Sequence, residues 1–224
     1  MSIFDYILAV LPGLPVSLSL TFAALVTAFL LSVLFTLILS LKPRILTQLV
    51  KGYITLFTGT PLLVQFFLIY FGPAQFEGLK AYPQLWELMS SPWLCAMVTL
   101  ALNSAAYSTL LFYGAVKAIP QGQWQSCQAL GMSQKQTMRI ILPYAFKRAL
   151  SSYSNEVVLI FKSTSLATTI SLLEVMGYSR RLFGQDYDLN VFIAAGIIYL
   201  VVNSLLTLAM RLIERRALAF EHRS

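Results

Sequence analysis

The chain has 224 residues, of which 58% are hydrophobic and only 11% are charged. Soluble domains contain about 45–50% apolar and about 25% charged residues. This composition therefore excludes a disordered chain, a fibrous repeat and a typical soluble enzyme. The formal net charge of +7 is compatible with nucleic-acid binding or with a membrane protein whose cations lie on one side. Because the sequence has no run of Lys and Arg and no aromatic–basic interleaving, the charge favours membrane topology over nucleic-acid recognition.

Five stretches are long and apolar enough to cross a hydrocarbon core of about 30 Å, which takes roughly 20 helical residues. They cover residues 16–41, 53–71, 93–116, 155–173 and 191–210, and Ser, Thr, Glu and Lys interrupt the fourth. The first is too long for a signal peptide, and no Lys or Arg precedes Lys42. For residues 1–11 we expect a short interfacial helix that is ended by Pro12-Gly13 and Pro15.

Positive charge alternates between the connections that join these stretches. The first and third connections and the tail carry twelve of the sixteen Lys and Arg: Lys42, Arg44, Lys51, Lys117, Lys135, Arg139, Lys147, Arg148, Arg211, Arg215, Arg216 and Arg223. The second and fourth connections are mixed: Glu77, Lys80, Glu87, Arg180, Arg181, Asp186 and Asp188. Cytoplasmic loops carry the excess of Lys and Arg. The pattern therefore predicts an N-terminus in the periplasm and a C-terminus in the cytoplasm.

The predicted fold class is an all-α integral membrane protein with about five transmembrane helices. We divide the chain into an N-terminal interfacial segment (1–15), a transmembrane domain (16–211) and a cytoplasmic tail (212–224).

The sequence patterns of common catalytic and cofactor sites are absent. There is no phosphate-binding G-x-x-x-x-G-K-[ST] loop and no H-E-x-x-H or Cys/His metal motif, and the single histidine, His222, lies in the charged tail. Cys95 and Cys127 are too few and too far apart for a disulfide framework. We expect no catalytic residue, no cofactor and no metal in this chain. Transport, conduction or scaffolding remain, and active transport would need an ion gradient or another subunit.

The third connection, residues 118–143, has the pattern of two short helices. Trp124, Cys127 and Leu130 recur at a spacing of three and predict one apolar stripe on the first helix. Gly131 suits the left-handed position just past a helix end. An interfacial hairpin on the lipid headgroups and a docking element for a cytoplasmic partner explain this stripe equally well.

The second helix of this connection has its own start and stop signals. Ser133 followed by Gln136 is typical of a capping box, and we expect Pro143 to break the helix.

Two motifs resemble those of the permeases of ABC importers for polar amino acids. The first is the EAA loop, E-A-A-x-x-x-G followed by I-x-L-P, which Gly131, Ile140, Leu142 and Pro143 match. Gln125, Ser126 and Cys127 replace its acidic and two small positions. The second is F-R-G-T-P-L-L-V-Q, written here Phe57-Thr58-Gly59-Thr60-Pro61-Leu62-Leu63-Val64-Gln65. Gly59, Thr60 and Pro61 within it predict a kink or a helix start.

Two further motifs complete the resemblance. Gly13-Leu14-x-x-Ser17-Leu18-x-Leu20-Thr21 is similar to the family's entry to its first span, and Lys162-x-Thr164-Ser165-Leu166 to its fourth-span motif. The four motifs cover most of the chain in family order. Within the histidine/arginine-type family, the segment 153–157 and Thr58 in place of arginine resemble the M-type permeases of arginine importers.

The resemblance implies a membrane-spanning subunit that imports a basic amino acid through the bacterial inner membrane. It implies a second permease, a Q-type chain related by a pseudo-twofold axis, two ATP-binding subunits that hold ATP-Mg, and a periplasmic amino-acid-binding protein. It also implies that the EAA loop couples to the ATPase through Trp124, Gln125, Ser126, Cys127, Leu130 and Gly131. Arginine is the expected substrate, and histidine, lysine or glutamine are the alternatives. A secondary transporter and a membrane scaffold are the rival functions.

Glu156 and Lys162 are the ionisable residues inside a predicted span. Each costs about 2.5–3.5 kcal/mol at mid-membrane, so both are expected to face protein or water. Six residues apart on a helix, they are poorly placed to pair with each other. The candidates for a substrate pathway are Glu156, Asn155, Lys162, Ser163, Thr164, Asn103 and Gln65. The alternative is that these polar groups only fix the packing of the helices.

Overall fold

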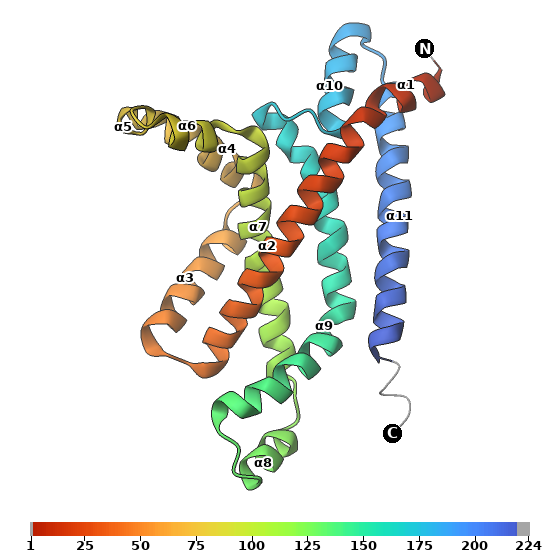
Figure 1. Ribbon diagram of the computed structural model, residues 1–224. Helices are drawn as coiled ribbons and strands as arrows, with labels where there is room; N and C mark the ends of the chain where they lie inside the picture. The colour runs from red at the N-terminus through yellow and green to blue at the C-terminus, as the bar shows by residue number, and fades with distance from the viewer. Residues whose placement is uncertain (1, 219–224) are drawn as a thin grey trace.

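The computed structural model describes residues 2–218, and these residues form helices and short connections without a β-strand (Figure 1). His222, which we expect in the tail, lies outside them. The elements are α1 (Ile3–Val10), η1 (Leu11–Gly13), α2 (Leu14–Leu41), α3 (Arg44–Gly59), α4 (Leu62–Phe71), η2 (Pro73–Gln75), α5 (Glu77–Lys80), α6 (Pro83–Ser90), α7 (Pro92–Lys117), α8 (Gln121–Ala129), α9 (Gln134–Ser163), η3 (Thr164–Ile170), α10 (Val175–Asp186) and α11 (Asn190–Leu218).

The number of candidate membrane spans agrees with the prediction of about five. Three helical segments, Ile3–Leu41, Pro92–Lys117 and Asn190–Ala217, are long and apolar enough to cross a bilayer by themselves. Two more spans result if each of two bent pairs counts as one: α3 with α4, bent by 107°, and α9–η3 with α10, bent by 48°. The predicted stretch 53–71 therefore contains a helix break, and the stretch 155–173 lies in the second half of α9 and in η3.

The chain alternates in direction along the bundle (Figure 1). The turn between α2 and α3, helix α8 and the last turns of α11 lie at one end, which we call the α8 end. Helices α1, α5, α6 and α10 lie at the other, which we call the α10 end. Helix α1 and the last turns of α11 are therefore at opposite ends of the molecule, as an odd number of crossings requires.

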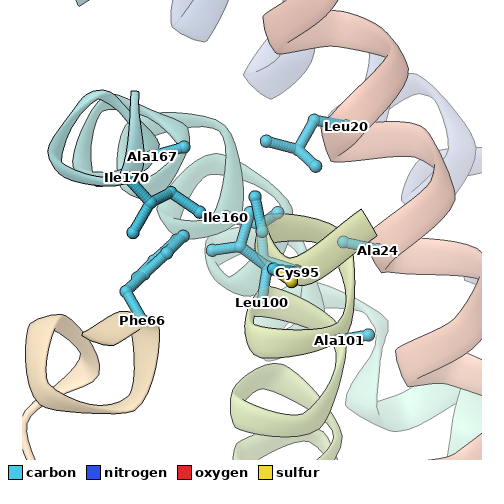
Figure 2. Packing of buried hydrophobic residues seen from close by; sticks show 10 residues of the cluster. Leu20, Ala24, Phe66, Cys95, Leu100, Ala101, Ile160, Ala167 and Ile170 are labelled. Atoms are coloured by element: carbon cyan, nitrogen blue, oxygen red, sulfur yellow. The ribbon is translucent and has the colours of Figure 1, made fainter. Parts of the chain in front are cut away.

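Helix α7 is the centre of the fold and packs against α2, α3, α4, α6, α9 and η3. Its contact with α2 is close because α2 presents a row of buried small residues at intervals of four: Ala24, Ala28, Ser32 and Thr36. In a membrane the hydrophobic effect does not drive helices together, because lipid tails are as apolar as the side chains. Small residues instead let two helix backbones approach closely and pack by van der Waals contact. Figure 2 shows the largest cluster, in which α2, α4, α7, α9 and η3 meet: Leu20, Ala24, Phe66, Cys95, Leu100, Ala101, Ile160, Ala167 and Ile170.

The expectation that Pro143 ends a helix is wrong. Helix α9 continues from Gln134 through Pro143 to Ser163. A proline inside a helix removes one backbone hydrogen bond and kinks the axis, and the first part of α9 lies at an angle to the rest (Figure 1). On both sides of the proline the helix is buried, at Leu142 and Ala145, in one cluster with the end of α7. Tertiary packing therefore holds the helix together where its local sequence favours a break.

Helix α1 ends at Val10, next to Pro12, but the prolines do not stop the helical segment as expected. The 3-10 turn η1 leads directly into α2, whose first turn contains Pro15, and Ile3–Leu41 forms one segment, so α1 is not a separate helix. It does not stand apart from the bundle, because Tyr6 and Val10 are buried in a cluster with residues of α10 and α11. At Gly13 the backbone lies in close contact with the backbone at the start of α10, and the absence of a side chain allows this contact. A Cβ atom at Gly13 would lie 2.5 Å from the backbone of Glu174.

Candidate functional site

A cavity of about 330 Å³ lies between α4, α7 and α9. Its lining combines apolar and polar side chains: Leu62, Leu100, Asn103, Ser104, Tyr107, Glu156, Leu159, Ile160 and Ser163. Three of the predicted pathway residues, Asn103, Glu156 and Ser163, are thus brought together in one place. A volume of this size with a few convergent polar groups is typical of a small-molecule site.

Glu156 is the one carboxylate that lines this cavity. Its side chain is half-buried, and Oε2 accepts a hydrogen bond of 3.4 Å from the Ser104 hydroxyl on α7. Among residues 2–218, no positively charged side chain lines the cavity with it. The cavity therefore presents an acidic group whose charge is unbalanced by the lining, which is the complement of a cationic ligand.

The break between α3 and α4 forms one rim of this region, as the Gly59-Thr60-Pro61 motif predicts. Helix α3 ends at Gly59 and α4 begins at Leu62. Gln65 is buried and donates from Nε2 to the Phe57 carbonyl at 2.9 Å and to Thr60 Oγ1 at 2.8 Å. Asn103 of α7 donates to Gln65 Oε1 at 3.0 Å and to the Phe57 carbonyl at 3.2 Å. Two amide side chains thus satisfy the backbone groups that the break leaves without helical partners.

The other predicted pathway residues lie elsewhere. Lys162 lines a separate cavity between α9 and α11, together with Asn203 and Arg211. This placement agrees with the poor pairing expected for Glu156 and Lys162. Asn155 is exposed on α9, whereas Thr164 is buried and donates to the Phe161 carbonyl at 2.8 Å.

Hydroxyl groups satisfy the backbone where the α-helical geometry of α9 changes to 3-10. Thr164 bonds to Phe161, and the Ser165 hydroxyl donates to the Lys162 carbonyl at 2.8 Å. The helical segment is not broken at this point, because α9 runs directly into η3 and the bend toward α10 follows Ile170.

The connection between α7 and α9 has the predicted helix–glycine–helix form. Gly131 has φ of +69°, and the N–H groups of Gly131 and Met132 donate to the carbonyls of Gln128 and Cys127. These two bonds are those of a Schellman motif. The capping box is also present, because Ser133 and Gln136 exchange side-chain-to-backbone hydrogen bonds at the start of α9.

The apolar stripe on α8 differs from the expectation of a single presented face. Trp124 packs on the cluster formed by the end of α7 and the start of α9, and Cys127 is buried. Leu130, in contrast, is 78% exposed. The periodicity predicted that these residues share one face of the helix, but it did not predict what packs against that face. Trp124 and Cys127 face the interior of this chain, and of the three only Leu130 is available to a partner. The exposed residues of α8 are Gln121, Gly122, Gln123, Gln125, Ser126, Gln128 and Ala129, followed by Leu130 and Gly131.

Sequence reasoning missed Glu174, which is fully buried. It is the N-cap of α10 and accepts a hydrogen bond from the Gly177 N–H at 2.8 Å. Its other oxygen accepts from the Tyr199 hydroxyl of α11 at 2.8 Å and the Ser17 hydroxyl of α2 at 3.2 Å. One sequence signal was available. Glu174 follows the apolar stretch and precedes Gly177 by three residues, which is the spacing of an N-cap side chain and the backbone N–H that it accepts from.

Comparison with known proteins places the chain in a family. Residues 28–218 match the family described as binding-protein-dependent transport system inner membrane component. The chain belongs to this family. Its members are permease subunits of ABC transporters. They are not enzymes, because ATP is hydrolysed on a separate subunit, and they work with ATP-binding subunits, a partner permease and a binding protein. The chain is accordingly a multi-pass inner-membrane protein.

Relatives within the family match along the whole chain. The arginine ABC transporter permease protein ArtM of Escherichia coli K12 is 68% identical over 221 residues, which are 99% of this chain and 100% of that protein. ArtM of Haemophilus influenzae is 53% identical over 97% of this chain and 96% of its own length. The nopaline transport system permease protein NocM of Agrobacterium fabrum is 42% identical over 91% of this chain and 86% of its own length.

Solved structures share the architecture. A chain from the crystal structure of an amino acid ABC transporter with histidines superposes with a TM-score of 0.83 at 26% identity, covering 95% of this chain and 96% of that one. An inward-facing structure of the MetNI methionine ABC transporter gives a TM-score of 0.78 and covers 97% of this chain and 99% of that one. Its sequence identity is 15%, so this similarity shows the fold alone.

Proposed function

We propose that this permease moves arginine across the inner membrane as part of an ATP-driven, binding-protein-dependent importer. The observation that carries the proposal is the 68% identity, over the full length of both chains, with a permease of an arginine transporter. The cavity beside the α3–α4 break supports it, because its one carboxylate suits a guanidinium or ammonium group. Histidine, lysine and glutamine are the alternative substrates within the same family.

We propose that Glu156 lies on the substrate pathway, with Asn103 and Ser163 in the same cavity. A carboxylate in a partly desolvated cavity attracts a cation more strongly than it does in water. A guanidinium group offers five donors in a planar fork that fits a carboxylate through two parallel hydrogen bonds. Gln65 then has an indirect role. Its hydrogen bonds hold the α3–α4 break in place, and Asn103 donates a hydrogen bond to Gln65. Asn155, Lys162 and Thr164 do not line this cavity, and we assign them no contact with substrate there.

We propose that α8 is the coupling helix and that it docks in the ATP-binding subunit. The exposed polar face and Leu130 would meet the partner, while Trp124 packs on the cluster formed by α7 and α9, and Cys127 is buried. Closure of the ATPase pair would then pull on α8 and change the angle of α7 and α9, a rigid-body switch. A second, Q-type permease would complete the pathway on the pseudo-twofold axis.

The proposed orientation places the α8 end in the cytoplasm. The turn at Lys42, the end of α7, the α8–α9 connection and the last turn of α11 all lie near that end (Figure 1). These segments carry the cations that the positive-inside rule assigns to the cytoplasm. The α10 end, with its mixed charge, would then face the periplasm and the binding protein.

Reconstitution tests the proposed function. The full complex is placed in proteoliposomes with the binding protein outside and ATP inside, and uptake of labelled arginine, lysine, histidine and glutamine is compared. We expect uptake of arginine that requires ATP and the binding protein. Uptake driven by an ion gradient without ATP would favour a secondary transporter, and assembly of the complex without any uptake would favour a scaffold.

One pair of variants tests the coupling role of α8 in the same assay. Gly131→Asp places a side chain at φ of +69° and a negative charge at a helix C-terminus, where negative charge is unfavourable. We expect it to insert normally and to abolish uptake. Gly131→Asn is the matched control, because asparagine tolerates the left-handed conformation and is neutral, so it should retain more uptake than Gly131→Asp. Wild-type uptake by Gly131→Asp would contradict the coupling role.

A further inference from the structure

Helix α10 presents two adjacent arginines at the end of the molecule opposite α8. The helix projects beyond the bundle (Figure 1). Its inner side is buried at Val175, Gly177 and Ser179, whereas Arg180 and Arg181 are exposed. One turn further on, Gly184 and Gln185 continue this exposed face. We call Arg180, Arg181, Gly184 and Gln185 the arginine face.

No carboxylate within residues 2–218 forms an ion pair with either arginine. The acids that follow on the chain, Asp186 and Asp188, are engaged elsewhere, since both accept from the Tyr6 hydroxyl, at 3.4 and 3.1 Å. The backbone N–H of Asn190 also bonds to Asp188 and lowers the pKa of that carboxyl below its usual value, which keeps it ionised. Two guanidinium groups thus remain available to an external anion.

The arginine face stands on a firmly held helix. The buried carboxylate of Glu174 caps α10 and joins it to α2 and α11. Gly177 lies so close to the chain that a Cβ atom there would be 2.4 Å from the Leu172 carbonyl oxygen. A force applied to the arginine face would therefore reach α2 and α11 directly, without first deforming α10.

We infer that the arginine face docks an acidic surface of the soluble binding protein. The inference rests on the proposed function, which places the α10 end outside the membrane, and on the family's dependence on a binding protein. Arginine suits this role because its fork binds a carboxylate through two parallel hydrogen bonds. Nothing lies within 4 Å of a Cβ atom added at Gly184, so a partner side chain can approach the helix one turn beyond the two arginines. Opposite charges across such a surface accelerate association and fix its orientation.

Charge reversal on the arginine face provides the test. The complex with Arg180→Glu and Arg181→Glu is placed in nanodiscs, and ATP hydrolysis is measured against the concentration of arginine-loaded binding protein. We expect the concentration for half-maximal stimulation to rise about tenfold at low salt and the difference to shrink at high salt. Hydrolysis without binding protein should not change. Lys80→Glu is the matched control, because Lys80 is an exposed cation at the same end but lies over the Trp86 ring of α6.

Each other outcome has a distinct meaning. An unchanged half-maximal concentration in the double variant, with normal uptake by the wild type, would overturn the docking site alone. A defect seen with phosphatidylglycerol but absent in phosphatidylcholine nanodiscs would show that the arginines bind lipid, and would also overturn it. Restoration by a binding protein with lysine in place of surface carboxylates would support it directly. Absence of uptake by the wild-type complex would instead overturn the proposed function.

Discussion

The α3–α4 break lies inside a candidate membrane span, whereas the α9–α10 break lies at the α10 end, where the span formed by α9 and η3 ends in the proposed orientation. Different chemistry replaces the lost helical hydrogen bonds at the two breaks. At the first, the neutral amides of Gln65 and Asn103 both donate to the Phe57 carbonyl, and Gln65 also donates to the Thr60 carbonyl. At the second, the fully buried carboxylate of Glu174 accepts from a backbone N–H and two hydroxyls. The first break therefore frees carbonyls at a helix C-terminus and the second frees N–H groups at a helix N-terminus, and each recruits side chains of the opposite hydrogen-bonding character.

The two breaks also differ in their surroundings. The first borders a cavity of about 330 Å³ with a half-buried acid, whereas the second is enclosed by α1, α2 and α11. A polar group beside a cavity can exchange its partners for a ligand or water. A polar group that is fully enclosed cannot, and its loss leaves donors unsatisfied. We therefore propose that the first break serves transport and that the second supports α10 mechanically.

Removal of the carboxylate at the second break should have the largest effect on stability. Glu174→Ala leaves the Gly177 N–H, Ser17 and Tyr199 donors unpaired, and each buried unsatisfied group costs about 1–3 kcal/mol. We expect a loss of several kcal/mol, seen as a lower yield of folded protein and a lower melting temperature in detergent. Ser179→Ala is a suitable control, because its hydroxyl bonds only to the Val175 carbonyl within the same helix. Equal melting temperatures for the two variants would contradict the role of Glu174.

The close passage at Gly13 should give the next largest effect. In Gly13→Ala the new Cβ meets the backbone of Glu174 and Val175 at 2.5 Å, and backbone cannot move aside as a flexible side chain can. Such overpacking costs about 1–3 kcal/mol. Gly196→Ala on α11 is the matched control, since nothing lies within 4 Å of its added Cβ. It should be neutral or slightly stabilising, because alanine is the better helix former. A melting temperature of Gly13→Ala at or above that of Gly196→Ala would disprove the tight contact.

Alteration of the first break should affect stability less and uptake more. Gln65→Leu keeps most of the side-chain volume but loses the bonds to Phe57, Thr60 and Asn103, at a cost of about 1–2 kcal/mol. We expect a small fall in melting temperature and a clear fall in the rate of arginine uptake per folded transporter. The change in uptake should exceed that of Asn155→Ala, which alters an exposed residue outside the cavity. Uptake at the wild-type rate would show that the break does not shape the pathway.

The sequence predicted those features that depend on local chemistry. The apolar spans, the break at Gly59-Thr60-Pro61, the left-handed Gly131 and the Ser133 capping box each follow from a few neighbouring residues. The direction of the α8 stripe did not follow, because a helical period defines a face without naming what covers it. The path of α9 through Pro143 depended on packing against α7, which outweighs the local preference for a break.

The role of Glu174 required the tertiary structure. Its donors Ser17 and Tyr199 come from α2 and α11, far from it along the chain. No residue close to it in the sequence indicates these partners. In the same way, Asn103 was predicted as a pathway residue without any sign that it also supports the α3–α4 break.

The central claim is that the α3–α4 break serves transport and the α9–α10 break serves stability. One measurement on two isosteric variants tests it most directly. Arginine uptake per folded transporter is determined for Glu156→Gln and Glu174→Gln in proteoliposomes that contain the complete complex. We predict that Glu156→Gln lowers the apparent kcat/KM about tenfold or more with an unchanged melting temperature, and that Glu174→Gln lowers the melting temperature while each folded transporter works at the wild-type rate. Wild-type uptake by Glu156→Gln, together with defective uptake by folded Glu174→Gln, would contradict the assignment.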